Sequence, residues 1–252
     1  MAIGDLLPTL AAYDYDLRST YHADAILSVD FADALSELDA LVGQAAVPIT
    51  EIVGGGGGET QLTQRIRRLL AQYDWHKHNF EVEKRIDEYP TYAATHEVDH
   101  VKRFDNGTIA LEIEWKNKDP FFDRDLDNFQ RLHADGAISL GVIITRGASF
   151  QNGIQNLIRE YAYAAGFQTA DDLARADMQR TRRQIRQVEQ LVERSGFAFP
   201  DAWAKVFTSD KFGTATTHWD KLDRRLVRGV GSPCPILAIG IPLGVVTRDA
   251  PS

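Results

Sequence analysis

The stretch HEVDHVKRFDNGTIALEIEWK, residues 96–116, decides the fold. It contains two β-prone runs, 96–104 and 108–116, on either side of Asp105-Asn106-Gly107. Asn-Gly between such runs is the strongest short-range signal for a β-hairpin. The sequence therefore predicts two antiparallel strands joined by a two-residue turn at Asn106-Gly107.

A turn at Asn106-Gly107 also fixes which residues of the two strands face each other. It pairs Asp99 with Glu114. Because side chains alternate along a strand, the hairpin has one charged face and one apolar face. The predicted charged face carries Glu97, Asp99, Glu112, Glu114 and Lys116. The predicted core face carries Val98, Leu111, Ile113 and Trp115.

The paired carboxylates of Asp99 and Glu114 suggest a metal site. Side chains that face each other across antiparallel strands lie about 4.5–5.5 Å apart at Cβ, where like charges destabilise the sheet. A divalent cation such as Mg²⁺ removes that repulsion and prefers oxygen ligands. Lys116, on the same face, is placed to orient a water molecule or stabilise phosphate charge. The alternative is a solvated strand face, and a β-bulge would shift the pairing.

The rest of the chain predicts further helices and strands around this hairpin. Helices are expected over 31–44, from Glu59 after the glycines 54–58, from Asp119-Pro120, over 153–164 and over 170–194, and strands over 78–87, 138–145 and 235–241. Interleaved helices and apolar strands indicate an α/β (α+β) fold with a mixed central sheet flanked by helices. No linker divides the chain, so a single domain over 1–252 is expected.

Charge is distributed very unevenly along the chain. The formal net charge is -8, which taken alone argues against a nucleic-acid binder. Residues 1–60, however, contain ten acidic residues and one basic residue, Arg18, so the remainder is nearly neutral. The single cysteine, Cys234, excludes an intrachain disulfide and a cysteine-based zinc site. No signal peptide or membrane span is recognised, and a cytoplasmic location is expected.

The arrangement Asp99 … Glu114-Trp115-Lys116 resembles the PD-(D/E)xK nuclease core. The flanking sequence is more specific. EIEWKNKDPFFDRDLD (112–127) and GVIITRG (141–147) are similar to type II restriction endonucleases of the BglII/BstYI group, as are HNFEVEKRID (78–87), THEVDHVK (95–102) and KFGTATTHWDKL (211–222). The resemblance covers roughly residues 20–240, and the block 95–147 carries most of it.

The resemblance implies a restriction-endonuclease-like core and Mg²⁺-dependent hydrolysis of double-stranded DNA at a short palindrome. A symmetric homodimer is the geometric expectation for reading a palindrome. Named members of the group cut sites with a GATC core, which is therefore the first site to consider. Those members carry an amide residue at the last catalytic position, whereas Lys116 matches the broader superfamily. A cognate DNA methyltransferase is the expected partner in such a system.

Site residues follow from the pattern and the resemblance together. Asp99, Glu114 and Lys116 are the expected catalytic residues, and Asp99, Glu114 and Glu59 the expected metal ligands. Glu59 has an alternative role as a favourable charge in the first turn of a helix. Glu112, one step further along the strand, is expected to be solvated or to act without touching the metal.

A basic and hydroxyl-rich set of residues is expected to contact DNA, since such side chains donate to phosphates and base edges. The set is Lys118, Lys211, Thr216, Thr217, His218 and Lys221. The alternatives are a surface lysine at 118 and a helix N-cap at Thr216 or Thr217.

Two other functions remain open from the sequence. One is a different PD-(D/E)xK nuclease, directed to DNA repair or to modified DNA. The other is a non-catalytic DNA-binding protein on the same scaffold.

Overall fold

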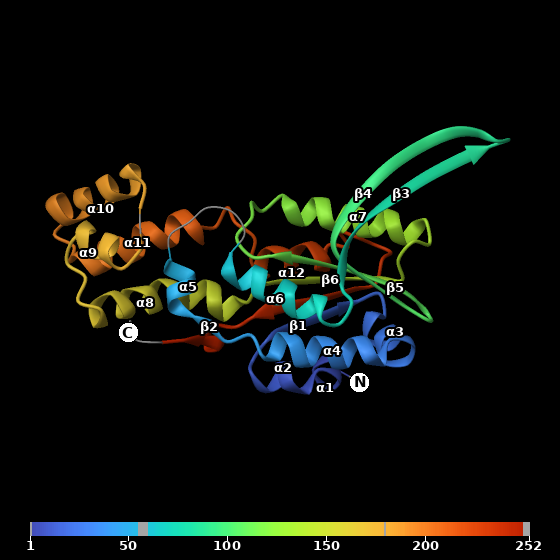
Figure 1. Ribbon diagram of the computed structural model, residues 1–252, viewed down its shortest axis with the longest axis horizontal. Helices are drawn as coiled ribbons and strands as arrows, with labels where there is room; N and C mark the ends of the chain where they lie inside the picture. The colour runs from blue at the N-terminus through green and yellow to red at the C-terminus, as the bar shows by residue number, and fades with distance from the viewer. Residues whose placement is uncertain (1, 55–59, 179, 249–252) are drawn as a thin grey trace.

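A six-stranded mixed sheet forms the centre of the computed structural model, which describes residues 2–54, 60–178 and 180–248 (Figure 1). The strand order is β1-β7-β6-β5-β4-β3. The strands are β1 (Asp16–Thr20), β3 (His76–Ile86), β4 (Tyr89–Phe104), β5 (Gly107–Glu114), β6 (Leu140–Arg146) and β7 (Ile236–Ile241). β5, β6 and β7 are parallel, whereas β1, β4 and β3 join their neighbours antiparallel. A second, two-stranded sheet pairs β2 (Val47–Pro48) with β8 (Val246–Thr247).

Helices cover both faces of the sheet and extend beyond one end of it (Figure 1). The first half of the chain supplies α1 (Ile3–Leu6), α2 (Pro8–Ala12), α3 (Ala23–Asp30), α4 (Ala32–Gly43), α5 (Ile49–Val53), α6 (Gln61–Ala71) and α7 (Phe121–Ala134). The second half supplies α8 (Ala148–Ala164), α9 (Ala170–Arg175), α10 (Arg182–Ser195), α11 (Phe199–Lys211), α12 (Trp219–Val227) and the short 3₁₀ helix η1 (Leu243–Val245). No helix in the described ranges is long and apolar enough to cross a membrane.

The alternating side chains of the central strands build two hydrophobic cores. Ile109, Leu111 and Ile113 of β5 pack into the larger core, with side chains of α4 and α6. Ala110 points the other way, into a smaller core with α7 and α12. Gly141 of β6 allows α7 to lie close, because a Cβ there would meet the Phe129 ring at 2.2 Å. The face that carries Glu112 and Glu114 is therefore covered by α7, not left to solvent.

Most predicted elements are present, with one clear exception. The helix over 31–44 and the strands over 78–87, 138–145 and 235–241 are confirmed as α4, β3, β6 and β7 within a few residues. The mixed sheet flanked by helices confirms the predicted fold class. The single helix over 170–194 is wrong: α9 ends at Arg175 and α10 begins at Arg182. Thr181 caps α10 by accepting a hydrogen bond from the Gln184 backbone, so the chain restarts there.

The predicted hairpin exists, but its register was wrong by two residues. Phe104 pairs with Gly107, so the turn residues are Asp105 and Asn106 rather than Asn106 and Gly107. Gly107 has a positive φ of 147°, and a Cβ there would meet Ser139 Oγ at 2.1 Å. Glycine is therefore needed at the first strand position. Because the register shifts by an even number of residues, Asp99 stays on the same face as Glu112 and Glu114. It lies beside Glu112, however, instead of beside Glu114.

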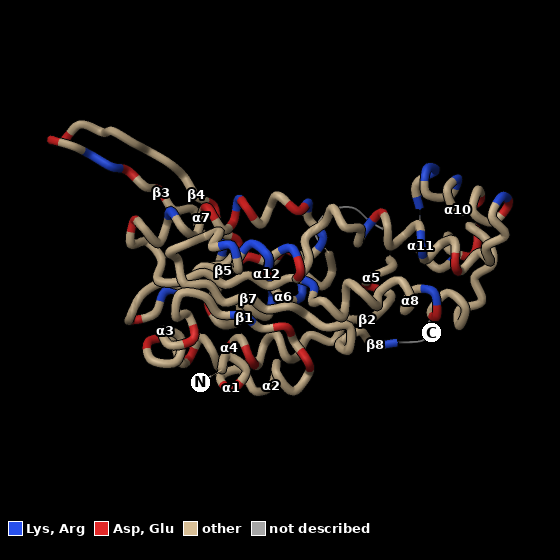
Figure 2. The backbone as a smooth tube through the Cα atoms, turned by 180° about the vertical axis from the view of Figure 1, so that it is seen from behind, with Lys and Arg blue, Asp and Glu red and all other residues tan. Residues whose placement is uncertain are grey.

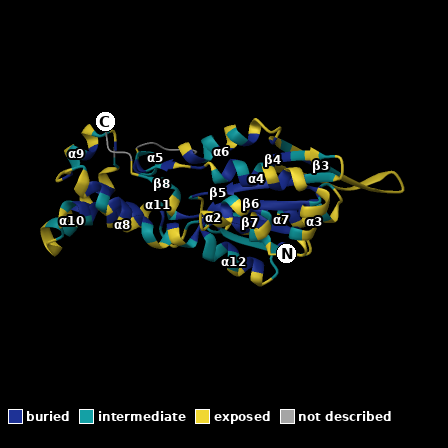
Figure 3. Cartoon of the chain, turned by 90° about the horizontal axis from the view of Figure 1, so that it is seen from below, coloured by how far each residue is buried: buried dark blue, intermediate teal, exposed yellow. Residues whose placement is uncertain are grey.

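A β-bulge interrupts β4 at Asp99. His76 pairs with Val101 and His78 with Val98, so one β3 residue, Lys77, lies opposite Asp99 and His100. Such a bulge leaves an extra residue unpaired and turns neighbouring side chains. Val98 and Val101 consequently both enter the α7 core. Beyond the bulge, β3 and β4 project from the body as an arm (Figures 1 and 3), in which residues 83–93 are exposed.

Candidate active site

A cluster of carboxylates lies where β4, β5 and α7 meet. Glu112 and Glu114 are 4 % and 2 % exposed, and Asp125 of α7 is 1 % exposed. Asp99 is exposed, and its backbone N–H lies 3.4 Å from Glu112 Oε1. The strand places the two glutamates on one face, and the helix lowers Asp125 onto them. The cluster therefore combines buried acids with one that reaches solvent.

Burial shifts the ionisation of Glu112. Removal from water is the main cause that raises its pKa to about 10, and the nearby charges of Asp125 and Asp99 raise it further. Glu112 is consequently protonated at neutral pH in the metal-free protein. A cation bound to this carboxylate would have to displace that proton.

Glu114 and Asp125 form the innermost pair of the cluster. Burial raises the pKa of both carboxyl groups, and the negative charge of Asp125 adds to the effect on Glu114. Asn117 Nδ2 donates to Glu114 Oε2 at 2.8 Å, and Arg124 Nε donates to Asp125 Oδ1 at 2.8 Å. Arg124 also lies 3.6 Å from Glu114. One arginine thus offsets part of the repulsion between two buried acids.

The donor chemistry of this cluster suits a hard divalent cation, although its carboxylates do not converge into a finished metal site. In the described residues no group of three or more His, Cys, Asp or Glu side chains is close enough to hold a metal ion. Asp125 shares a hydrogen bond with Glu114, and its buried Oδ2 atom has no partner with regular hydrogen-bond geometry in the described part of the chain. Carboxylate oxygens are the ligands that Mg²⁺ prefers, so the residues fit the ion by type.

Lys116 lies apart from these carboxylates. β5 ends at Glu114, and the chain bends at Trp115, Lys116 and Asn117. Burial lowers the pKa of the half-buried Lys116, and the charges of Lys211 and Arg146 lower it further. Among the described residues no carboxylate lies within ion-pair distance of Lys116. The lysine belongs to a group of cations beside the acidic cluster.

Arg146, at the end of β6, holds together the two loops that contain most of the predicted DNA-contacting residues. It is fully buried and donates to Trp115 O at 2.7 Å, Gln151 Oε1 at 3.0 Å and Thr216 Oγ1 at 2.9 Å. Burial lowers the pKa of its guanidinium group to about 9. The two loops are also paired directly through an isolated β-bridge between Lys118 and Thr216.

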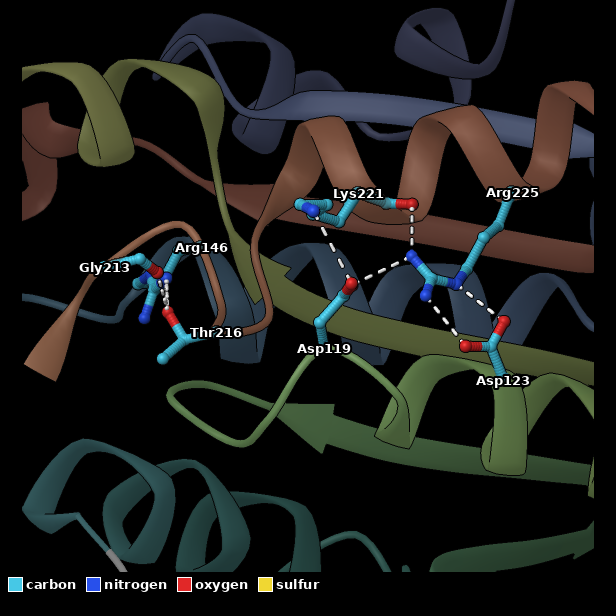
Figure 4. Close-up of polar contacts among 7 residues, drawn as sticks. All are labelled: Asp119, Asp123, Arg146, Gly213, Thr216, Lys221 and Arg225. Atoms are coloured by element: carbon cyan, nitrogen blue, oxygen red, sulfur yellow. Dashed lines mark hydrogen bonds and ion pairs between the residues drawn. The ribbon is translucent and has the colours of Figure 1, made fainter.

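A second set of contacts fixes the beginning of α7 against α12 (Figure 4). Arg225 donates to Asp119 at 2.9 Å and to both Asp123 oxygens at 2.8 Å, and Lys221 lies 3.5 Å from Asp119. The helix expected from Asp119-Pro120 is α7, which begins after Pro120 with no side-chain cap. The carboxylate of Asp119 is directed to α12 instead.

The structure brings the predicted DNA-contacting residues together but exposes them unequally. Lys118 is exposed, and Lys211, Thr216 and Lys221 are half-buried. Thr217 and His218 are buried, and burial lowers the pKa of His218. The alternative role of Thr216 or Thr217 as a helix N-cap is excluded, since α12 begins after His218 without a side-chain cap.

Glu59, the third predicted metal ligand, lies outside the described residues. Glu112 was expected to be solvated or to act without touching the metal, but it is only 4 % exposed and lies beside Asp99. Asp125 was not recognised from the sequence. The signal that identifies it is its place on the buried side of α7 between Phe122 and Phe129.

Comparison with known proteins agrees with this arrangement. No curated protein matches the chain. The family model described as restriction endonuclease BglII/BglIII matches residues 15–241, which include the whole sheet, the acidic cluster and both loops held by Arg146. The chain therefore belongs to the restriction endonuclease BglII/BglIII family and is a site-specific deoxyribonuclease.

Proposed function

We propose that the protein is a type II restriction endonuclease that cuts double-stranded DNA at a short palindrome with Mg²⁺, and that Asp99, Glu112 and Glu114 hold the metal. The observation that supports this most is the hairpin register, which places Asp99 beside Glu112. Glu114 follows on the same strand face, against Asp125. Bound Mg²⁺ would polarise the phosphate and acidify a water molecule.

This proposal changes the residues assigned to the catalytic motif. The sequence suggested Asp99, Glu114 and Lys116, but the register moves the second acid to Glu112. The last catalytic position then falls on Glu114. An acid would thus stand where relatives carry an amide and the superfamily carries a lysine. Lys116, Lys118, Lys211 and Lys221 are proposed to face the DNA backbone, because phosphate contacts supply most of the affinity for DNA.

Digestion of unmethylated phage DNA tests the activity. We expect discrete fragments with Mg²⁺ and none with EDTA, and fragments that end near GATC would support that core. Random degradation would favour a nuclease of repair or modified DNA. Binding without cleavage would favour a non-catalytic scaffold. The homodimer expected for a palindrome is tested by sedimentation, and a methyltransferase encoded nearby would support a restriction system.

Single substitutions test the residue assignment. We expect Asp99→Asn and Glu112→Gln to abolish cleavage while binding to duplex DNA in Ca²⁺ persists. Glu81→Gln, at an exposed position on β3, is the matched control and should cut normally. Cleavage by Glu112→Gln at the wild-type rate would return the motif to Glu114 and Lys116. Lys116→Ala, which we expect to weaken binding more than the rate at saturating DNA, separates the same two assignments.

A further inference from the structure

A cleft that shares only Asp99 with the proposed metal site lies between α6 and the bulged part of β3 and β4. It has a volume of about 310 Å³. Its lining residues are Arg67, Arg68, Ala71, Trp75, His76, Lys77, Asp99 and His100. The cleft therefore joins the C-terminal end of one helix to the β-bulge, two elements that are separate in the sequence.

The cleft concentrates positive charge in an acidic protein. Arg67 and Arg68 are both exposed on α6, and Figure 2 shows basic residues on this helix. Lys77 is exposed as well, and its Nζ atom forms an ion pair with Glu97 Oε1 at 2.6 Å on the protein surface. Among the described residues that line the cleft, Asp99 is the only acid. The balance of the lining charges is positive, so the cleft suits an anion.

Buried polar groups in the wall of the cleft support a ligand there. His100 is 2 % exposed and lines the cleft, where its ring interacts with the Leu111 backbone and neither ring nitrogen has a partner with regular hydrogen-bond geometry in the described residues. A bound anion or its water would add a well-formed hydrogen bond to this buried ring. The β-bulge, which places His100 next to Asp99, creates this position.

Asp99 links the cleft to the acidic cluster. Its side chain lines the cleft, and its backbone lies against Glu112. An anion in the cleft would thus lie next to Asp99, one of the proposed metal ligands. In a DNA strand, a neighbouring phosphate likewise lies next to the phosphate that is cut, so the cleft is placed to bind such a neighbour.

We propose that this cleft binds a DNA backbone phosphate next to the phosphodiester that is hydrolysed, with Arg68 and Lys77 as the main contacts. The inference rests on the proposed function of the chain. The Arg68 guanidinium group can hold two phosphate oxygens at once, whereas the Lys77 ammonium group acts as a point charge. The contact recognises the backbone and carries no sequence information.

Salt dependence of DNA binding tests the inference independently of cleavage. The probe is a mixed-sequence duplex in Ca²⁺, titrated between 50 and 200 mM monovalent salt. The slope of log K against log salt is about −0.9 for each phosphate neutralised. We expect Arg68→Ala to reduce the magnitude of the slope by about 0.9, and Arg68→Lys to retain the wild-type slope. Arg186→Ala, an exposed arginine on α10 remote from the cleft, is the matched control and should leave it unchanged.

Two outcomes overturn the inference, and they differ from failure of the proposed function. An Arg68→Ala slope equal to that of the wild-type protein would show that no phosphate is bound at Arg68. An equal reduction of the salt slope in Arg68→Ala and Arg186→Ala would show a general effect of charge on DNA binding. If the wild-type protein neither binds the duplex nor cuts phage DNA, the proposed function itself fails. Circular dichroism of each variant establishes that Arg68→Ala is folded.

Discussion

At the scale of single residues, the buried carboxyl group of Glu112, a proposed metal ligand, opposes the stability of the fold. Its pKa is about 10 in the folded, metal-free protein and near 4.5 when unfolded. Between pH 4.5 and pH 10 the folded state therefore binds one more proton than the unfolded state. The free energy of unfolding consequently falls as the pH rises through this range. We expect Glu112→Gln to raise the melting temperature in EDTA, by about 2–4 °C for each kcal/mol of added free energy of unfolding. The increase should be larger at pH 8 than at pH 5.

The measurement is a thermal melt in EDTA at both pH values, with Glu81→Gln as control. Glu81 is exposed, so its replacement should leave the melting temperature unchanged at either pH. An equal or lower melting temperature for Glu112→Gln at pH 8 would contradict the buried, protonated state assigned to Glu112. Loss of cleavage together with a gain in stability would be typical of a residue retained for function.

Arg146 makes the opposite contribution, because it is buried and structural. It donates three hydrogen bonds to uncharged acceptors and has no carboxylate partner in the described residues. Arg146→Ala leaves the Trp115 carbonyl unsatisfied, at about 1–3 kcal/mol for a buried group, in addition to the lost packing. We expect a loss of about 3 kcal/mol by urea denaturation. Thr216→Ala should lose less, and the exposed Arg186→Ala almost nothing.

At the scale of elements, the β4–β5 turn decides which acids meet. Gly107 is the first residue of β5 and not part of the turn. Its positive φ, and the overlap that an added Cβ would have with Ser139, forbid a side chain at this position. We expect Gly107→Ala to cost about 1–3 kcal/mol from strain, more than Gly136→Ala, which has a positive φ of 72° but no neighbour within 4 Å. Gly244→Ala, in open space without a positive φ, should be neutral in the same urea titration.

The hairpin also shows what sequence patterns can and cannot predict. Alternation along residues 109–115 was sufficient to assign which side chains share a face of β5, because successive side chains of a strand point to opposite faces. It did not predict that α7 buries Glu112 and Glu114 as well. The register was not predictable, since Asp105-Asn106-Gly107 permits two turns and the choice depends on Ser139, far along the chain. The bulge at Asp99 and the approach of Asp125 are likewise tertiary. The sequence therefore predicted the hairpin and the shared face of its acids, but it paired Asp99 with Glu114, whereas the structure places Asp99 beside Glu112.

At the scale of the whole molecule, the acidic and basic regions are separated. Acidic residues gather on α1 to α4, whereas Lys and Arg lie on α6 and α12 (Figure 2). The net charge of -8 is therefore a poor guide to the partner of the protein. What a DNA phosphate experiences is the local charge within about 8 Å at physiological salt. This separation lets an acidic chain bind a polyanion.

The separation predicts that charge changes on the two sides are not equivalent. Asp30→Asn with Asp33→Asn removes two exposed negative charges beside α4, and Arg68→Ala removes one positive charge from α6. If net charge governed binding, the double variant would strengthen DNA binding by more than Arg68→Ala weakens it. Screening beyond about 8 Å predicts the reverse: less than a twofold change for the aspartate pair at 0.15 M salt. Fluorescence anisotropy with the mixed-sequence duplex measures both, and a larger effect of the aspartate pair would mean that DNA also contacts the α4 side.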